Sequence, residues 1–137
     1  MVALPTSHKQ DVIAKVCAVR CKCPPIPEPN TSVGFVKDGN LVGGVTYSCF
    51  TGREIWAAIW VDDKSVWSRK NLQAMFAYPF EVCGVVRLCG IVSAKNKASL
   101  KMMEQMGFVQ EGRYRKYFPN DVDGIVFAML KEECKWI

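Results

Sequence analysis

Two short stretches of this 137-residue chain hold polar side chains that are able to bind a ligand through hydrogen bonds or charge. The first contains Ser68, Arg69 and Lys70, which offer one hydroxyl group and two positive charges for charge-assisted hydrogen bonds. The second begins with Asn96 and ends with Ser99. An asparagine amide both accepts and donates, so Asn96 can cap a helix and still bind a ligand. Each stretch also has a purely structural interpretation, as a solvated basic loop and as an ordinary helix cap.

Other kinds of catalytic site find little support in the sequence. The one histidine, His8, lies close to the N-terminus, which disfavours Ser-His and Cys-His schemes. The sequence has no phosphate loop ending in Gly-Lys-Ser/Thr and no dinucleotide-binding Gly-x-Gly-x-x-Gly. Cys17, Cys21 and Cys23 are closely spaced, but no second cysteine pair has zinc-ligand spacing. We therefore expect reduced thiols and no metal site.

Composition describes one folded globular domain over residues 1–137, because half of the residues are hydrophobic and 23% are charged. No run of 18 apolar residues predicts a membrane span, and the N-terminus does not resemble a secretion signal, so we expect a cytoplasmic protein. The net charge of +5 suits an anionic partner, either a phosphate-bearing coenzyme or nucleic acid. For nucleic acid the candidate is RYRKYF, residues 113–118, where aromatic and basic side chains alternate.

The first half of the chain predicts a helix, a stiff connector and a meander of strands. Residues 7–22 place apolar side chains at helical spacing, and four prolines between Pro24 and Pro29 follow them. Short turns then separate three predicted strands, at residues 33–36, 41–50 and 54–61. The last of these, EIWAAIWV, is apolar on both faces, which predicts a central position in the sheet.

The second half predicts alternating helices and strands. A helix over residues 71–80 precedes a buried strand at 85–92, and strand-helix-strand order implies a right-handed crossover with a parallel pair. Asn96 and Gly107 bracket a further helix, and a hairpin pairs residues 113–118 with 125–130. The predicted fold class is α+β: a mixed sheet, an antiparallel meander followed by a β-α-β crossover, with helices on both faces.

The stretch Ser93–Gly112 reads SAKNKASLKMMEQMGFVQEG. It resembles the N-x-A-S…E-x-x-G-F…E-G segment of the GNAT superfamily of acetyl-coenzyme A-dependent N-acetyltransferases. It is most similar to the branch that acetylates N-terminal amines of ribosomal proteins. The resemblance implies the GNAT fold over about residues 32–130, with a shortened N-terminal part, and acetyl-coenzyme A as co-substrate.

The resemblance also implies which residues would hold the coenzyme. The backbone of Ile59, Trp60 and Val61 would contact the pantetheine arm and polarise the thioester carbonyl, and Asn96 and Ser99 would approach the arm from the motif helix. The pyrophosphate would lie on the loop that enters the crossover helix, where the family has glycines and this chain has none. The corresponding residues are Trp67, Ser68, Arg69, Lys70 and Asn71.

The acid and the base that the resemblance implies are less clearly marked. Glu54 is the nearest equivalent of the glutamate that often serves as general base, whereas Asp62 and Asp63 suit a turn better. In many members a tyrosine of the motif helix protonates the leaving thiolate, and that position here is Met103. Tyr114 or Tyr117 on the following strand would have to replace it.

The leading hypothesis is an N-acetyltransferase that moves acetyl from coenzyme A to a primary amine by direct attack in a ternary complex. The amine would be a protein N-terminus or a small molecule, and its identity cannot be read from the sequence. A non-catalytic GNAT-like binding or assembly module is the first alternative, and a basic nucleic-acid-binding domain is the second. No membrane partner is expected, and a homo-oligomer is left open.

Overall fold

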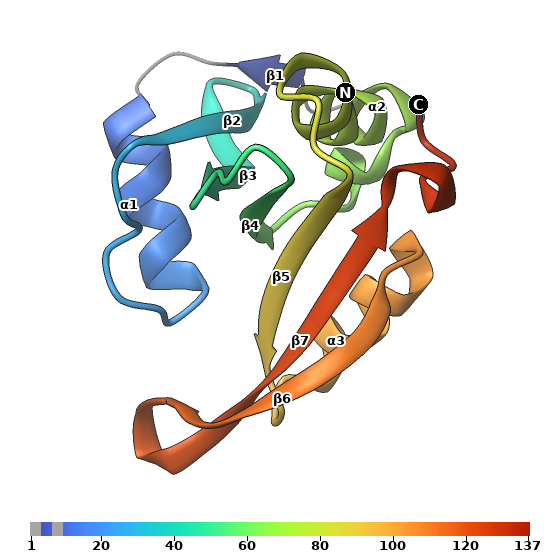
Figure 1. Cartoon of the computed structure of the whole chain (residues 1–137). Coiled ribbons are helices and arrows are strands. Elements are labelled where there is room, and N and C mark those ends of the chain that lie inside the picture. Colours follow the sequence, from blue (N-terminus) through green and yellow to red (C-terminus); the bar gives the residue numbers. More distant parts are fainter. Residues whose placement is uncertain (1–3, 7–9) are drawn as a thin grey trace.

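A computed structural model describes residues 4–6 and 10–137 of the chain (Figure 1). Its centre is a seven-stranded sheet in the order β1-β2-β3-β4-β5-β7-β6. The strands are β1 (Leu4–Thr6), β2 (Asn30–Lys37), β3 (Asn40–Ser48), β4 (Glu54–Val61), β5 (Arg87–Ser93), β6 (Val109–Phe118) and β7 (Val122–Leu130). Neighbouring strands are antiparallel except for the parallel pair β4 and β5, so the predicted mixed sheet and crossover are confirmed.

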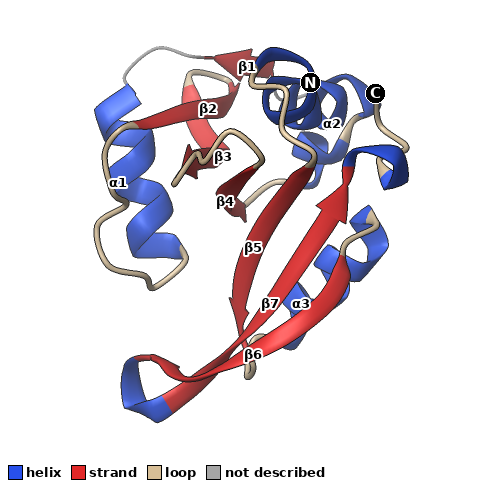
Figure 2. Ribbon diagram, in the orientation of Figure 1, coloured by secondary structure: helices blue, strands red, loops and turns tan. Residues whose placement is uncertain are grey.

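Three α-helices cover the sheet, α1 (Gln10–Arg20) on one face and α2 (Arg69–Ala77) and α3 (Lys97–Met106) on the other (Figure 2). The alternation along β4 explains this division, because successive side chains of a strand point to opposite faces. Ile55 packs in the larger core with α2 and α3, whereas Trp60 packs with Ile13 and Cys17 of α1. Strand β4 is therefore buried from both sides, as its sequence predicts.

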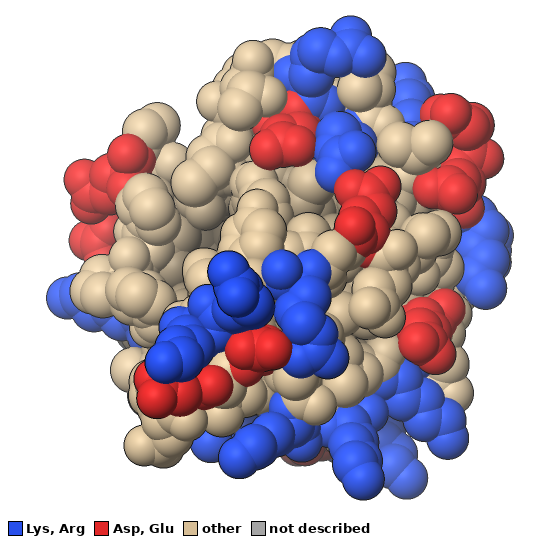
Figure 3. Space-filling view, turned by 60° about the horizontal axis from the view of Figure 1, so that its bottom comes forward, with Lys and Arg blue, Asp and Glu red and all other residues tan. Residues whose placement is uncertain are grey.

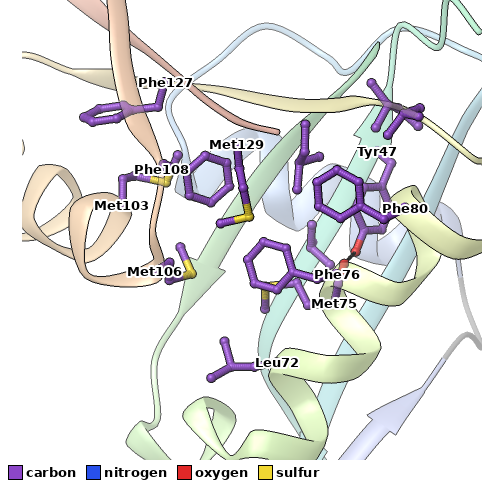
Figure 4. Packing of buried hydrophobic residues seen from close by; sticks show 14 of the residues in the cluster. Tyr47, Leu72, Met75, Phe76, Phe80, Met103, Met106, Phe108, Phe127 and Met129 are labelled. Carbon is purple, nitrogen blue, oxygen red and sulfur yellow. Dashed lines mark hydrogen bonds between the residues drawn. The ribbon is translucent and has the colours of Figure 1, made fainter. Parts of the chain in front are cut away.

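The larger core joins α2 and α3 across the centre of the sheet (Figure 4). Phe76 of α2 stacks on Trp136 and contacts Phe108, with ring centroids 6.4 and 6.0 Å away. The hydroxyl of the fully buried Tyr47 donates to the carbonyl oxygen of Met75, so that this polar group is satisfied inside the core. This packing fixes the two helix N-termini relative to β4 and β5.

Both helix N-termini on this face carry side-chain caps. Asn96 Oδ1 accepts from the N–H of Ser99 at 3.1 Å, and Ser68 Oγ accepts from the N–H of Asn71 at 3.2 Å. At the other end of α3, Gly107 takes the left-handed conformation with φ 106°, and Phe108 folds back so that its N–H donates to Met103 O. The predicted cap and stop of the motif helix are confirmed.

Some element boundaries differ from those predicted. Strand β1 is additional, because its three residues are too few to show a periodic pattern and they pair with distant residues 34–36. Helix α2 begins at Arg69 rather than Asn71. It is followed by one turn of π-helix (Tyr78–Val82), which contains Pro79. The predicted first helix begins at Gln10 in the described part; residues 7–9, including His8, lie outside it. No described helix is long and apolar enough to cross a membrane.

Candidate active-site groove

The parallel strands β4 and β5 pair over three residues and then separate. Their register joins Glu54 to Arg87, Ile55 to Leu88 and Trp56 to Cys89. Beyond this point β4 remains paired with β3 as far as Val61, so only its other edge is left without a partner strand. A groove of about 980 Å³ occupies the space between the separated ends. An open strand edge is able to bind an extended ligand as an added strand.

The β4 edge presents carbonyl groups to this groove. Gly90 of β5 lies where the strands begin to part. A Cβ atom built there would lie 3.5 Å from Ala57 O and 3.0 Å from the Cε of Met103, so a larger side chain would press on the end of Met103. Two residues further along β4, Ile59 O accepts from the Cys21 thiol at 3.5 Å. Ala57 and Ile59 thus direct their carbonyls away from β3, as the alternation of a strand requires.

Asn96 and Ser99 line the opposite wall of the groove, at the start of α3. The Asn96 oxygen is committed to the cap, whereas no hydrogen bond of its amide nitrogen occurs among the described residues. The structural and ligand-binding interpretations of Asn96 are therefore compatible, because different atoms carry them. Met103 also lines the groove and is buried.

Tyr114 and Tyr117 reach the groove from the β6–β7 hairpin. Their rings are 5.9 Å apart, and about half of each side chain is exposed. Tyr117 packs over Gly124, where an added Cβ would lie 3.2 Å from the Cβ of Tyr117. Partial burial raises the pKa of Tyr117 above its ordinary value, so this hydroxyl keeps its proton at neutral pH.

The wall facing the hairpin comes from the end of α1 and the proline-rich connector, residues 20–27. Burial raises the pKa of Cys17 to about 11 and that of Cys21 to about 12. Both thiols therefore remain neutral at physiological pH, which disfavours a role as nucleophile. No group of three potential metal ligands occurs among the residues that the structure describes.

Glu54 lies outside the groove, so the structure does not support its predicted role as general base. It sits where β4 and β5 are still paired, and its carboxylate accepts from Arg87 Nε at 3.1 Å and from the Trp56 indole N–H at 3.0 Å. Arg87 also pairs with Glu111. The sequence could not show this placement, because Arg87 arrives from a strand 33 residues away.

The loop expected to hold the pyrophosphate is likewise absent from the groove lining, which includes none of residues 64–71. Here a short 3-10 helix (Lys64–Trp67) precedes α2, and Asp63 Oδ1 caps it by accepting from the N–H of Ser65 at 2.8 Å. That N–H, the Ser65 hydroxyl and Lys37 lower the pKa of Asp63 to about 2. Asn71 is fully buried, whereas Arg69 and Lys70 are exposed at the start of α2.

Several groove residues have no predicted role. Two of them could have been found from the sequence. Gly90 is a glycine inside an apolar run, which often marks a close approach of another group, and Trp56 belongs to the strand expected to carry the coenzyme. Lys22 and Lys95 had no signal, because exposed lysines look alike in a sequence. Of the predicted residues, the groove brings together Ile59, Trp60, Val61, Asn96, Ser99 and Tyr114. The Trp60 carbonyl faces β3, where a Cβ built on Gly43 would lie 3.2 Å from it, so the predicted backbone contact of Trp60 with the coenzyme arm is not supported.

No family model and no curated protein matches the sequence. Solved structures do match. A mutant form of spermidine/spermine N-acetyltransferase from Vibrio cholerae has a TM-score of 0.74 at 14% identity, over 95% of each chain. An acetyltransferase of the GNAT family from Bacillus anthracis has a TM-score of 0.60 at 22% identity, over 76% of this chain and 67% of that one.

Two further structures described as acetyltransferases have TM-scores of 0.64 and 0.65 at 21% and 23% identity, and they match 76% and 78% of this chain. The chain spans 62% and 60% of their lengths. At sequence identities this low, the structural similarity shows a shared fold and nothing more. Its strand order, its parallel pair that separates and its capped α3 together give this chain the fold of the GNAT acetyltransferases.

Proposed function

We propose that this chain is an acetyl-coenzyme A-dependent N-acetyltransferase that acts on a primary amine by direct attack in a ternary complex. The observation that carries the proposal is the unpaired β4 edge, which faces Asn96 and Ser99 across the groove of a GNAT fold. The finer resemblance to ribosomal-protein acetyltransferases rests on residues 93–112 alone, and a protein N-terminus is one acceptor that it suggests.

The groove fits an extended amide-bearing arm. The carbonyl groups of Ala57 and Ile59 suit amide N–H donors of the arm, once the Cys21 thiol has released Ile59 O. A strand residue directs its N–H and its C=O to the same side, so the N–H groups of these residues also face the groove. One of them is placed to polarise a thioester carbonyl. The Asn96 amide nitrogen would donate from the opposite wall.

Acetyl-coenzyme A would supply a thioester whose carbonyl carbon takes the amine lone pair, as the C–N bond forms and the C–S bond breaks. The departing sulfur needs a proton, and Tyr114 and Tyr117 are hydroxyl groups that line the groove. Either tyrosine is a candidate donor, because both line the groove and both are partly exposed. Met103 has no proton to give.

A non-catalytic binding or assembly module remains the second candidate, and the loop before α2 is the observation that favours it. Asp63 holds the Ser65 N–H and brings a negative charge to the loop where a pyrophosphate would need free N–H donors. The nucleic-acid alternative has less support, because Arg113 and Lys116 pair with Asp123 and Asp121, and the tyrosines of RYRKYF turn to the groove.

Calorimetry with acetyl-coenzyme A, followed by an acetyl-transfer assay on an amine panel, separates the two candidates. The enzyme proposal expects binding, and it expects Asn96→Asp to weaken binding by about tenfold, the equivalent of ~1.4 kcal/mol. This variant keeps the cap oxygen and removes the amide donor. Binding without transfer to any amine would favour the module, and absence of binding at millimolar coenzyme would exclude the enzyme.

A further inference from the structure

The groove has an unusual charge balance for a site that binds an amine. Among the residues that the structure describes, its lining includes Arg20, Lys22 and Lys95 but no aspartate or glutamate. The nearby carboxylates face other cations. Asp62 pairs with Arg20, Glu54 with Arg87 and Asp123 with Arg113, and the exposed Asp121 of the hairpin lies 4.0 Å from Lys116. Figure 3 looks onto this side of the molecule, where uncharged side chains fill the hollow and charged side chains of both signs stand around it.

Arg20 is the least available of the three cations. Asp62 holds its guanidinium group, which also lies over the Trp60 ring at 4.9 Å from the ring centroid. No ion pair occurs for Lys22 or Lys95 among the described residues, and both lysines are exposed. Two ammonium groups thus remain to act on a ligand at the rim.

Much of the rest of the lining is apolar or aromatic. It includes Trp56 of β4, Tyr114 and Tyr117 of the hairpin, and the prolines Pro24, Pro25 and Pro27 of the connector. Aromatic rings and proline rings offer flat, weakly polar surfaces that suit an apolar body. Together with the lysines they suit a ligand that has both an apolar part and a negative charge.

We infer that the acceptor is a primary amine with an apolar or aromatic body and an anionic group, and that Lys22 and Lys95 select it over polycationic amines. The inference rests on the proposed acetyltransferase function and specifies the acceptor of the same groove. A polyamine would bring additional ammonium groups into a site with no carboxylate to pair them, whereas a carboxylate or phosphate would find two lysines.

The lining that the structure describes includes no carboxylate to act as base. We therefore expect the acceptor amine to lose its proton to water before it attacks. Neutral amine then attacks the thioester carbon, and the C–S bond breaks as the C–N bond forms. The nitrogen loses a proton to solvent, a tyrosine hydroxyl gives a proton to the departing sulfur, and the tyrosinate takes a proton back from solvent.

The test compares amines that share one reacting group and differ in the group at the far end. The probes are para-(aminomethyl)benzoate, its neutral carboxamide, para-xylylenediamine as the dication, and spermidine. A matching phosphonate distinguishes a phosphate from a carboxylate preference. We expect kcat/KM to fall in the order anion, neutral amine, dication, with the anion about tenfold above the dication, as two exposed charge interactions would give.

Charge reversal supplies the second arm of the test. Lys22→Glu, Lys95→Glu or the double variant should reduce or invert the preference when the amines are compared at saturating acetyl-coenzyme A. Lys15→Glu is the matched control, because Lys15 is exposed on α1 and outside the groove lining. The inference would be overturned if transfer favoured the dication or spermidine. It would also be overturned if the double variant left the order of kcat/KM among the amines unchanged. Failure of acetyl-coenzyme A to bind at all would instead count against the proposed function.

Discussion

Helices α2 and α3 begin with the same kind of cap, but only α3 begins at the groove. Each N-terminus has a polar cap whose oxygen accepts from a backbone N–H three residues on, Ser68 for α2 and Asn96 for α3. Asn96 and Ser99 line the groove, whereas no residue from Lys64 to Asn71 does so. A helix cap alone therefore does not make a binding site. The N-terminus of α3 differs from that of α2 because it lies beside an unpaired strand edge.

The loop before α2 also differs in how its backbone is used. Asp63 Oδ1 occupies the Ser65 N–H at 2.8 Å, and Asn71 is buried with its amide nitrogen 3.5 Å from Ser65 O. The loop is therefore organised by its own side chains. We propose that binding at the groove depends mainly on the α3 side and on β4, with a smaller electrostatic contribution from Arg69 and Lys70.

The largest effect is expected from filling the point where β4 and β5 separate. Gly90→Val would place a branched side chain against Met103 and the Ala57 carbonyl, the carbonyl we assign to the coenzyme arm. We expect acetyl-coenzyme A affinity to fall by at least about tenfold, or ~1.4 kcal/mol. Calorimetry on the folded variant measures the change. Gly112→Val, where an added Cβ meets no atom within 4 Å, is the control and should bind normally.

The next effect compares the two caps directly. Asn96→Ala and Ser68→Ala should each cost about 1 kcal/mol of unfolding free energy, since each removes a side-chain acceptor from a helix N-terminus. Asn96→Ala should in addition weaken coenzyme binding, and Ser68→Ala should not. Denaturant unfolding and calorimetry together measure this. Equal losses of binding in the two variants would contradict the distinction between the helices.

A smaller effect is expected from the exposed charge at the start of α2. Arg69→Ala should reduce coenzyme affinity by about two- to threefold, the size of one exposed charge interaction. The reduction should disappear at high salt, because exposed charges are screened. A loss larger than that of Asn96→Asp would place the dominant contact on the loop and reverse the comparison.

The smallest effect concerns acid stability of the same loop. The folded state holds the pKa of Asp63 at about 2, below the ordinary value of 3.8, so its stabilising contribution is present above about pH 4. It is lost as the pH falls from there through the folded value near 2. Asp63→Asn should flatten the fall of stability over this range, as followed by urea unfolding at a series of pH values. If the free energy of unfolding of the variant falls with decreasing pH as it does in the unmodified protein, Asp63 does not form the cap.

Much of the fold follows from local signals in the sequence. The bounds of β4 agree with those of the apolar run EIWAAIWV, and the caps of α3 follow from Asn96 and Gly107. Tertiary pairing decided what the sequence could not show. Glu54 pairs with Arg87 of the neighbouring strand and so does not reach the groove. The connector forms a groove wall because α1 packs on Trp60.

The most direct test of the account is an amide chemical-shift titration of the isotope-labelled protein with acetyl-coenzyme A. We predict the largest shifts at Ala57–Val61 and Asn96–Ser99, on the two walls of the groove, with smaller shifts at residues 64–71. Saturable binding whose shifts leave both walls unchanged would contradict the assignment of the groove to the coenzyme.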